Sequence, residues 1–438
     1  MIEKTTARAF ATRFGLVGEY SGGITQSGGS GANLTALVIA RGYLFPKTRS
    51  DGNEGVKLAI FTSQASHYSV EKAARVCGLG SRNVWQIPTD AEGRMCADKL
   101  ERAIKTAWGQ GYEPFFANAT AGTTVMGAYD PLEEIADICQ AYGLWFHVDA
   151  SWGGSVVFSD KYRFRLNGAE RANSLTVNPH KMLGVPVTCS FLLTSDLRKF
   201  HRANSLPAGY LFHDVVEASP EAATGDFKPV PESRESEVWD LADLTLQCGR
   251  KGDALKLALG WVYYGSAGYG QKIEDALDIA NHLSTLICAE PDLVPVGPHP
   301  VPCLQVCFYF APGGILSTVE RNTAMTKAIA ARLVGCGFMT DYAPGEHGSF
   351  LRVVVNISTK RQTVERMVRE ILRLGMECSE ASATPGILRT QRADSIPEAS
   401  TRLTEPKSCT EQHGPQRQLF PSIWDCDFAK LKLEALNW

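Results

Sequence analysis

Two short apolar segments of this chain each stop abruptly at polar residues, and these stops constrain the fold more than any other feature. Segment 144–148 has the composition of a buried strand and ends at Asp149; segment 174–177 ends at Asn178-Pro179, with Lys181 close behind. Proline cannot continue a strand ladder, so the second segment must end there. Side chains that follow parallel strands meet at one edge of a sheet. We therefore expect an α/β fold in which Asp149 and Lys181 lie near one another.

An aspartate and a lysine placed in this way suit the chemistry of pyridoxal phosphate. The lysine amine can hold the aldehyde of the cofactor as a Schiff base, and the carboxylate can keep the pyridine nitrogen protonated so that the ring accepts electrons. Taken singly, each residue has a simpler explanation, because most such lysines lie on the surface and many aspartates cap helices. Three further segments favour the cofactor site.

The first is a glycine-rich turn, 27–33, that leads directly into an apolar helical segment, 34–41. Such a turn presents free backbone N–H groups at the positive end of a helix dipole, which suits a phosphate group. Glycine-rich loops are common, so this turn alone is weak evidence for a phosphate site.

The other two are apolar segments that end at groups able to contact a flat cofactor. His67 comes just after the strand-like segment 58–61, where an imidazole could stack on a ring. A lone histidine in this position is more often a cap or a surface residue. Segment 114–118 is followed by small hydroxyl residues, Thr120 among them, which could bind phosphate or a ring oxygen or could form an ordinary turn.

The composition agrees with a soluble enzyme. The chain has 438 residues, 44% of them hydrophobic, and a formal net charge of −3, which favours neither nucleic acid nor membrane as a partner. No apolar run is long enough to span a bilayer, and the first residues lack the apolar core of a secretory signal. The 12 cysteines are scattered singly, without the spacing of a zinc site. We expect reduced thiols, a cytoplasmic protein and no metal.

Strand-like and helical segments alternate from about residue 28 to residue 193, as in a parallel α/β sheet. Helices are predicted from apolar periodicity at 131–142, 269–288 and 323–335, and strands of a smaller domain at 301–310 and 351–357.

These patterns predict three parts of the chain. A large cofactor-binding α/β domain spans 1–265 and contains a mobile loop or insertion at 213–238. A small C-terminal α+β domain spans 266–376. The remaining residues, 377–438, form a polar tail whose composition is typical of disorder.

Several stretches of the chain occur together in a recognisable order: SGGSGAN, SHYS, NATAGTT, HVDASWGGS, LNGAERANS, NPHKMLG, AGYLF, LQCGRKGD and FLRVVVN. They resemble the group II pyridoxal-phosphate-dependent amino acid decarboxylases, and most closely the animal-type glutamate, cysteine sulfinate and aspartate decarboxylases. The combination of NPHK with an upstream HVDA-WGG is the most specific part of this resemblance. It implies the fold of pyridoxal-phosphate-dependent transferases (fold type I, that of aspartate aminotransferase), with a large, mainly parallel sheet, and pyridoxal 5'-phosphate as cofactor.

The resemblance also implies roles for individual residues. Lys181 would form the Schiff base, Asp149 would pair with the pyridinium, and His180 would lie beside the Schiff base. The remaining cofactor contacts would be phosphate contacts from Gly29 and Ser30, stacking of His67 on one face of the ring with Ala150 on the other, and further contacts from Thr120 and Asn178. Arg352 matches the arginine that holds the α-carboxylate of the substrate in the family.

Two departures from the family pattern bear on activity. In the family a mobile loop carries a tyrosine that protonates Cα, and alignment places Trp239 there. An indole N–H is a poor acid. Either His180, Lys181 or another loop residue would deliver the proton, or protonation of Cα would be slow, which would favour a ketone or aldehyde side product. Family members also carry a long segment before the glycine-rich turn, which wraps the partner subunit and contributes to the side-chain pocket. Its absence here bears on substrate choice and on the stability of the expected homodimer.

The predicted function is α-decarboxylation of a small acidic amino acid. Aspartate, giving β-alanine, is slightly preferred over glutamate, giving GABA, and over cysteine sulfinate, giving hypotaurine. Two alternatives remain open. One is a shortened homologue with little or no activity. The other is a pyridoxal-phosphate decarboxylase-oxidase that forms an aldehyde.

Overall fold

The computed structural model describes residues 1–206 and 240–383. Contacts group residues Met1–Cys378 into one compact unit, and the description below concerns that unit. The predicted mobile loop at 213–238 and nearly all of the predicted tail lie outside the described residues. Among the described helices, none is both long and apolar enough to cross a membrane.

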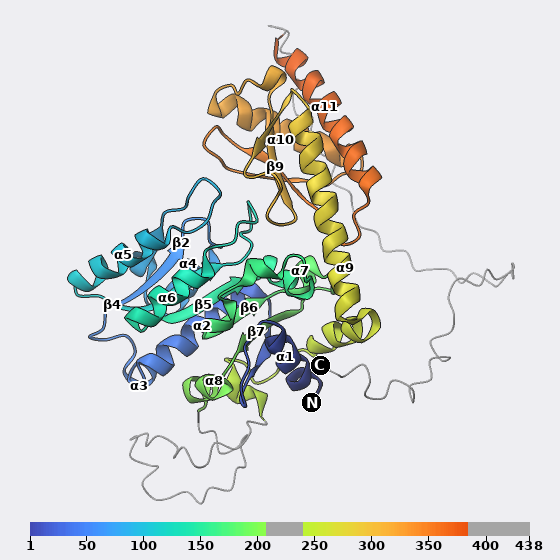
Figure 1. Cartoon of the computed structure of the whole chain (residues 1–438). Coiled ribbons are helices and arrows are strands. Elements are labelled where there is room, and N and C mark those ends of the chain that lie inside the picture. The colour runs from blue at the N-terminus through green and yellow to red at the C-terminus, as the bar shows by residue number, and fades with distance from the viewer. Residues whose placement is uncertain (207–239, 384–438) are drawn as a thin grey trace, which may run out of the picture. The chain divides into compact units, whose positions relative to one another are not determined.

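A seven-stranded sheet carries the predicted site (Figure 1), with strand order β1-β7-β6-β5-β4-β2-β3. Its strands are β1 (Gly22–Gln26), β2 (Leu58–Ser63), β3 (Val84–Ile87), β4 (Glu113–Thr120), β5 (Trp145–Ala150), β6 (Ser174–Val177) and β7 (Ser190–Thr194). The strands from β6 to β3 run parallel, whereas β7 is antiparallel to both β6 and β1. The predicted parallel pattern therefore ends at β6. The β6–β7 connection contains only a short helix, and antiparallel strands do not need a long crossover.

Helices cover both faces of this sheet. They are α1 (Ile2–Arg13), α2 (Gly29–Leu44), α3 (Thr48–Asp51), α4 (Ser69–Val76), α5 (Ala97–Gly109), α6 (Leu132–Tyr142), α7 (Pro179–Met182) and α8 (Leu197–Asn204). Short 3₁₀ turns occur at Ser81–Asn83, Gly153–Phe158, Arg163–Leu166, Ala169–Arg171, Leu241–Leu244 and Pro312–Gly314.

Strand alternation divides the core into two hydrophobic clusters. Phe61 and Phe146 join the cluster with α1, α5 and α6, whereas Ile60 and Trp145 join the cluster with α2, α4 and α8. His147 and Asp149 follow Trp145 at intervals of two along β5, so their side chains point to the same face as Trp145. That face is the one covered by α2.

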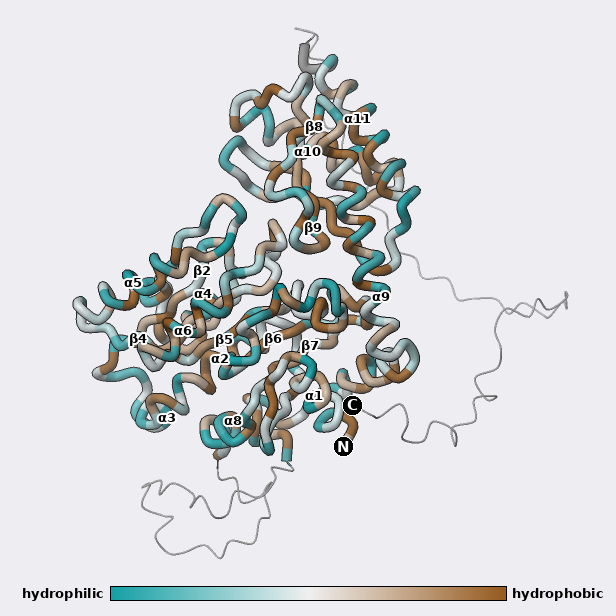
Figure 2. Tube along the Cα trace, viewed as in Figure 1, coloured by the Kyte–Doolittle hydropathy of each residue, from teal (hydrophilic) through white to brown (hydrophobic). Residues whose placement is uncertain are grey.

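A second, four-stranded antiparallel sheet follows in sequence, with order β10-β11-β9-β8. Its strands are β8 (Leu293–Val296), β9 (Gln305–Phe310), β10 (Asp341–Ala343) and β11 (Phe350–Val354), and its helices are α10 (Val319–Gly335) and α11 (Arg361–Ala383). Figure 2 shows hydrophobic residues along β9 and hydrophilic residues over much of α8. Buried strand residues and exposed helix residues thus follow the usual partition of a folded core.

The long helix α9 (Ala254–Ala289) precedes the second sheet and contacts α1, β8 and β9. It is interrupted at Gly265, where φ is 68°, a value that favours glycine. The predicted domain boundary at 265/266 falls at this break, and the division into a large and a small domain stays a prediction.

Most predicted elements coincide with observed ones. Strand 174–177 is β6, strand 58–61 lies within β2, and helix 131–142 is α6. Helix 269–288 is only the second part of α9, because Gly265 conceals the continuity of the earlier turns. Helix α1 and strand β1 were not predicted.

Candidate active site

A cavity of about 220 Å³ lies at the carboxyl ends of β4, β5 and β6. It brings together most residues that the sequence singled out. The residues that line it are Gly29, Ser30, Asn33, His67, Tyr68, Thr120, Gly122, Thr124, Asp149, Ser151, Trp152, Asn178, His180 and Lys181.

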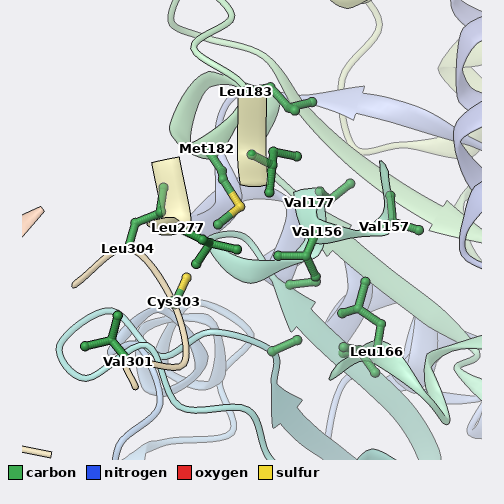
Figure 3. Close-up of a cluster of buried hydrophobic side chains, with 14 of the residues drawn as sticks. Val156, Val157, Leu166, Val177, Met182, Leu183, Leu277, Val301, Cys303 and Leu304 are labelled. Carbon is green, nitrogen blue, oxygen red and sulfur yellow. The ribbon is translucent and has the colours of Figure 1, made fainter. Parts of the chain in front are cut away.

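Lys181 lies on α7, a single helical turn that follows β6. Pro179 occupies the first turn of this helix, where its missing N–H and fixed φ are well tolerated. Met182 and Leu183 are buried and anchor the turn in the hydrophobic cluster that Figure 3 shows. This anchoring leaves Lys181 facing the cavity rather than the core.

The surroundings of the Lys181 amine favour its neutral form, in which an amine can act as a nucleophile. Burial lowers its pKa, and Arg352 lowers it further, while Asp149 acts in the opposite direction. Its Nζ lies 4.7 Å from the centroid of the Trp152 ring. Within residues 1–206 and 240–383 the amine makes no ion pair. It therefore remains available to a ligand in the cavity.

Asp149 projects from the end of β5 and is held through both carboxylate oxygens. Oδ1 accepts a hydrogen bond from the backbone N–H of Ser151 at 3.0 Å, and Oδ2 accepts one from Nδ2 of Asn33 at 2.8 Å. The side chain is only 4% exposed. A carboxylate oriented in this way can bind a protonated ring nitrogen in the cavity.

The glycine-rich turn forms the start of α2 and lines the same cavity as Lys181. Gly28, at the N-cap, has φ 118°, and α2 begins at Gly29. A Cβ atom at position 29 would lie 2.7 Å from both Nδ2 of Asn178 and Oγ of Ser151, so a larger residue here would displace these side chains. The N–H groups of the first turn, including that of Ser30, are free of helical partners and suit an anion.

Thr120, at the end of β4, provides a direct test of whether the cavity fits a polar cofactor. Its hydroxyl is buried yet has no hydrogen-bond partner among the described residues. A buried hydroxyl without a partner is costly, and a ligand oxygen in the cavity would satisfy it. The residues present therefore fit a flat, phosphate-bearing cofactor such as pyridoxal phosphate.

Two histidines flank the cavity, and burial lowers the pKa of both. Nδ1 of His67 accepts a hydrogen bond from the backbone N–H of Ser69 at 3.2 Å, which fixes its ring beside the cavity. Nδ1 of His180 lies 2.6 Å from the carbonyl oxygen of Cys189. Near neutral pH both rings are therefore largely uncharged and can exchange a proton.

The structure corrects the position of Ala150. Successive side chains of a strand point to opposite faces, so Ala150 points away from Asp149 and packs near Gly154 and Val177 in the hydrophobic core. Ser151 lines the cavity instead. Ala150 therefore does not face a cofactor ring in this cavity.

Arg352 lies on β11 of the second sheet and does not line the cavity itself. Its guanidinium carbon is 5.9 Å from the centroid of the Trp152 ring, and the side chain is 11% exposed. Nη1 lies 3.3 Å from Oδ2 of Asp341 on the neighbouring strand, and its buried Nε has no partner among the described residues. The arginine is thus close to the Lys181 side of the cavity and retains free donor capacity.

Sequence reasoning missed several residues of the cavity, although each lies inside a motif that it had recognised. The missed residues are Asn33, Tyr68, Gly122, Ser151 and Trp152. The available signal was their position beside the recognised residues, at the turns that follow β2, β4 and β5 and at the start of α2. Trp239 lies outside the described residues.

Comparison with known proteins agrees with this geometry. Residues 9–310 match the family model of the pyridoxal-dependent decarboxylase conserved domain. The chain is 49% identical over 378 residues to the L-aspartate decarboxylase dtxS4 of Metarhizium robertsii, covering 86% of this chain and 72% of that protein. It is 40% identical over 396 residues to the glutamate decarboxylase-like protein FG08083 of Gibberella zeae, covering 85% of this chain and 76% of that protein.

Solved structures share the fold. Mouse CSAD is 34% identical, with a TM-score of 0.75, and the match covers 85% of this chain and 76% of that chain. Oryza sativa TDC, in a structure with PLP and tryptamine, is 25% identical with a TM-score of 0.75, and the match covers 86% of this chain and 76% of that chain. These similarities confirm the predicted fold class.

Proposed function

Because the chain belongs to the pyridoxal-dependent decarboxylases, and is a pyridoxal-phosphate-dependent amino acid decarboxylase, we propose that its substrate is aspartate and its product β-alanine. The observation that carries the choice of substrate is the 49% identity to an L-aspartate decarboxylase. Glutamate and cysteine sulfinate are the second candidates, and the glutamate decarboxylase-like relative favours the former.

The proposed roles of the residues follow from the cavity. Bound pyridoxal phosphate supplies an aldehyde that condenses with amines and a ring that accepts the electrons of the broken bond. Lys181 would hold the aldehyde and give it up to the substrate amine, and Asp149 would accept the N–H of the ring. Gly29 and Ser30 would bind the phosphate through backbone N–H groups. The free hydroxyl of Thr120 would bind a ring oxygen.

The remaining residues would orient the substrate and move its proton. Arg352 would hold the α-carboxylate, because a guanidinium binds a carboxylate through two parallel hydrogen bonds. His67 would stack on the ring, and Asn178 would support the phosphate turn against which it lies. His180 and Lys181 are the described residues best placed to return a proton to Cα, since burial lowers the pKa of both.

We also propose a homodimer and a cytoplasmic location. The first half of α9 exposes large apolar side chains, Leu255, Leu259, Val262, Tyr263 and Tyr264, and such a surface suits a second copy of the chain. The cysteines of the described residues are free thiols, which is consistent with a reducing compartment.

A substrate panel tests the proposed function. CO2 release by the purified protein would be measured with the twenty standard amino acids and cysteine sulfinate, with added pyridoxal phosphate. We expect aspartate to give the highest kcat/KM. The control variant Lys181→Ala should lose the visible absorbance of the bound cofactor and several orders of magnitude of turnover. Faster turnover of glutamate or cysteine sulfinate would overturn the choice of aspartate.

Product analysis in the same assay separates the alternatives. A decarboxylase releases β-alanine and CO2 without ammonia or peroxide, whereas a decarboxylase-oxidase releases an aldehyde together with both. An inactive homologue would release no CO2 from any member of the panel.

A further inference from the structure

A chain of buried hydrogen bonds runs from Asp149 into the core behind the cavity. Oδ2 of Asp149 accepts from Nδ2 of Asn33 at 2.8 Å, and Oδ1 of Asn33 lies 3.1 Å from Nε2 of His147. Nδ1 of His147 lies 2.8 Å from Oγ of Ser174, which also accepts from Nε1 of Trp145 at 2.8 Å. His147 and Ser174 are fully buried. Asn33 and Asp149, at the other end of this chain of hydrogen bonds, line the cavity.

The carboxylate of Asp149 determines which atom donates and which accepts in each of these hydrogen bonds. A carboxylate only accepts, so Asn33 must turn its amide nitrogen toward Asp149 and its oxygen toward His147. The oxygen of Asn33 also only accepts, so Nε2 of His147 must carry a hydrogen. A neutral ring then has a bare Nδ1, which accepts from the hydroxyl of Ser174. The N–H of Trp145 occupies a lone pair of that hydroxyl, and the hydroxyl of Thr176 lies 3.5 Å from Nε2 of His147, where it can share the same hydrogen.

Two further contacts keep this arrangement in place. Asn33 donates a second hydrogen bond from Nδ2 to Oγ of Ser69 at 2.9 Å, so the same amide nitrogen is held by two residues. The His147 ring stacks on Phe116 with a centroid distance of 5.5 Å. Burial lowers the pKa of His147 to about 4, so the ring is neutral at physiological pH, as the pattern requires.

We propose that Asn33 and His147 are positioning residues that hold the carboxylate of Asp149 in the orientation in which it pairs with the ring nitrogen of the cofactor. The proposal rests on the proposed role of Asp149. His147 does not line the cavity, so it acts only through Asn33. The N–H of its neutral ring binds the amide oxygen of Asn33 and so helps to hold the amide with its nitrogen, rather than its oxygen, toward Asp149.

The test compares variants by the protonation of the cofactor. His147→Phe keeps an aromatic ring against Phe116 but removes the N–H that orients Asn33. His147→Gln can restore an amide N–H to that oxygen. Nitrogen NMR of isotopically labelled pyridoxal phosphate, bound to the purified protein, reports whether the ring nitrogen carries a proton. The unfolding midpoint of each variant is measured alongside.

We expect a protonated ring nitrogen in the wild-type protein and a shift toward the neutral form in His147→Phe. His147→Phe weakens the hydrogen bond from Asn33 to the charged carboxylate of Asp149. We therefore expect kcat to fall by about 10- to 100-fold while KM changes little. His147→Gln should recover most of the protonated nitrogen signal and most of kcat. The matched control is Asn118→Val. Asn118 lies opposite His147 in the register of β4 and β5, and its buried amide donates a hydrogen bond to Thr62 rather than to Asp149. It should leave the nitrogen signal unchanged.

Each outcome decides the question. If His147→Phe binds the cofactor with a fully protonated ring nitrogen and normal kcat, the positioning role is wrong. If His147→Phe does not fold, Asn33→Leu replaces it, and the same two readouts apply. Asp149→Asn separates the two levels of the argument. If the ring nitrogen stays protonated in Asp149→Asn, the role of Asp149 itself is wrong. If the proton is lost in Asp149→Asn but kept in the His147 and Asn33 variants, only the positioning role of Asn33 and His147 is wrong.

Discussion

Burial is the main cause of the pKa shifts among the residues of the candidate active site. It lowers the pKa of Lys181, His67 and His180, in each case as the largest contribution. The charged neighbours act in both directions, because Asp149 raises the pKa of Lys181 while Arg352 lowers it. A site built in this way favours neutral bases over fixed charges, which suits covalent catalysis by an amine.

His147 should make the protein sensitive to mild acid. Burial depresses its pKa from 6.5 to about 4, so below pH 6.5 the unfolded chain binds a proton that the folded chain does not. Its contribution to stability is therefore complete above pH 6.5 and is lost as the pH falls toward 4. A pKa difference of this size between the folded and unfolded chain corresponds to about 3 kcal/mol in the free energy of unfolding. Urea unfolding at several pH values, for the wild type and His147→Gln, measures it.

In that comparison the wild type should lose stability relative to His147→Gln as the pH falls, because the variant cannot gain this proton. A difference between the two proteins that stays constant with pH would show that His147 is not the group responsible.

Two hypotheses explain Arg352: it binds the substrate, or it serves only to form an ion pair with Asp341. If it holds the substrate carboxylate, Arg352→Lys loses the paired donors, so KM should rise and kcat should fall, with kcat/KM lower by about 10- to 100-fold. Steady-state kinetics with aspartate measures both constants. Asp341→Asn is the matched control, since it breaks the ion pair and leaves the guanidinium in place.

Asp341 is 69% exposed, so losing this pair should cost at most about 1 kcal/mol of stability. Equal kinetic defects in the two variants, or normal kinetics in Arg352→Lys, would favour the purely structural explanation.

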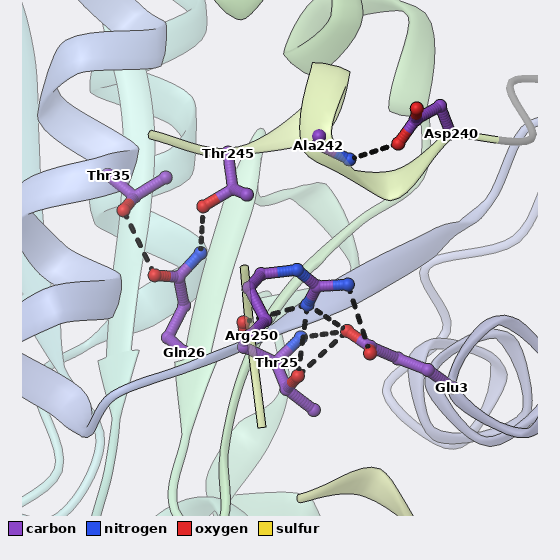
Figure 4. A network of polar contacts seen from close by, with 8 residues as sticks. All are labelled: Glu3, Thr25, Gln26, Thr35, Asp240, Ala242, Thr245 and Arg250. Atoms are coloured by element: carbon purple, nitrogen blue, oxygen red, sulfur yellow. Dashed lines mark hydrogen bonds and ion pairs between the residues drawn. The ribbon is translucent and has the colours of Figure 1, made fainter. Parts of the chain in front are cut away.

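At the scale of elements, a buried ion pair ties helix α1 to strand β1 and to the segment before α9 (Figure 4). Nη1 of Arg250 lies 2.6 Å from Oε1 of Glu3, and both side chains are nearly buried. Glu3 also accepts from the backbone N–H of Thr25 at 2.7 Å and from its hydroxyl at 2.8 Å. Because β1 leads into the glycine-rich turn, this network supports the start of α2 as well.

Removal of Arg250 should therefore destabilise the protein strongly. Arg250→Met leaves the carboxylate of Glu3 buried without its cation, which should cost about 3 kcal/mol. Chemical unfolding of the wild type and the variant measures the loss. Arg102→Met is the control, because Arg102 pairs with Asp98 on an exposed helix and its loss should cost less than about 0.5 kcal/mol. A loss in Arg250→Met as small as that in Arg102→Met would show that the buried ion pair adds little to stability.

The elements that the sequence predicted well are those with a local signal. Strand β6 is bounded by Asn178-Pro179, and α6 has a single apolar face, so both could be placed from composition and periodicity. Helix α1 and strand β1 could not, because they are held by partners far along the chain, among them Arg250. The direction of β7 likewise depends on its pairing with β1 and β6.

The residues of the candidate site likewise divide into those with a local sequence signal and those placed by distant contacts. Lys181 and Asp149 follow strands and could be predicted from position, whereas the contact between Asn33 and Asp149 joins residues 116 positions apart. Ala150 was misplaced for a simple reason. Its neighbour in sequence lies on the cavity face, and strand alternation puts Ala150 on the other face.

At the scale of the whole molecule, the exposed face of α9 is the strongest sign of self-association. Leu255, Leu259 and Val262 recur at helical spacing and are 44%, 61% and 48% exposed, and Tyr263 beside them is 80% exposed. Apolar side chains gathered in this way on one helix are costly in water and are commonly covered by a partner.

We therefore expect the wild-type protein to be a dimer and Leu259→Glu to dissociate it, since a charge would be buried in an apolar contact. Light scattering during size-exclusion chromatography measures the mass of each, and dilution should lower the unfolding temperature of the wild type but not that of the variant. Val334→Glu is the control, because Val334 on α10 is 58% exposed but stands apart from this face in sequence. A monomeric wild type, or a Leu259→Glu variant that remains a dimer, would show that this face of α9 does not join two copies.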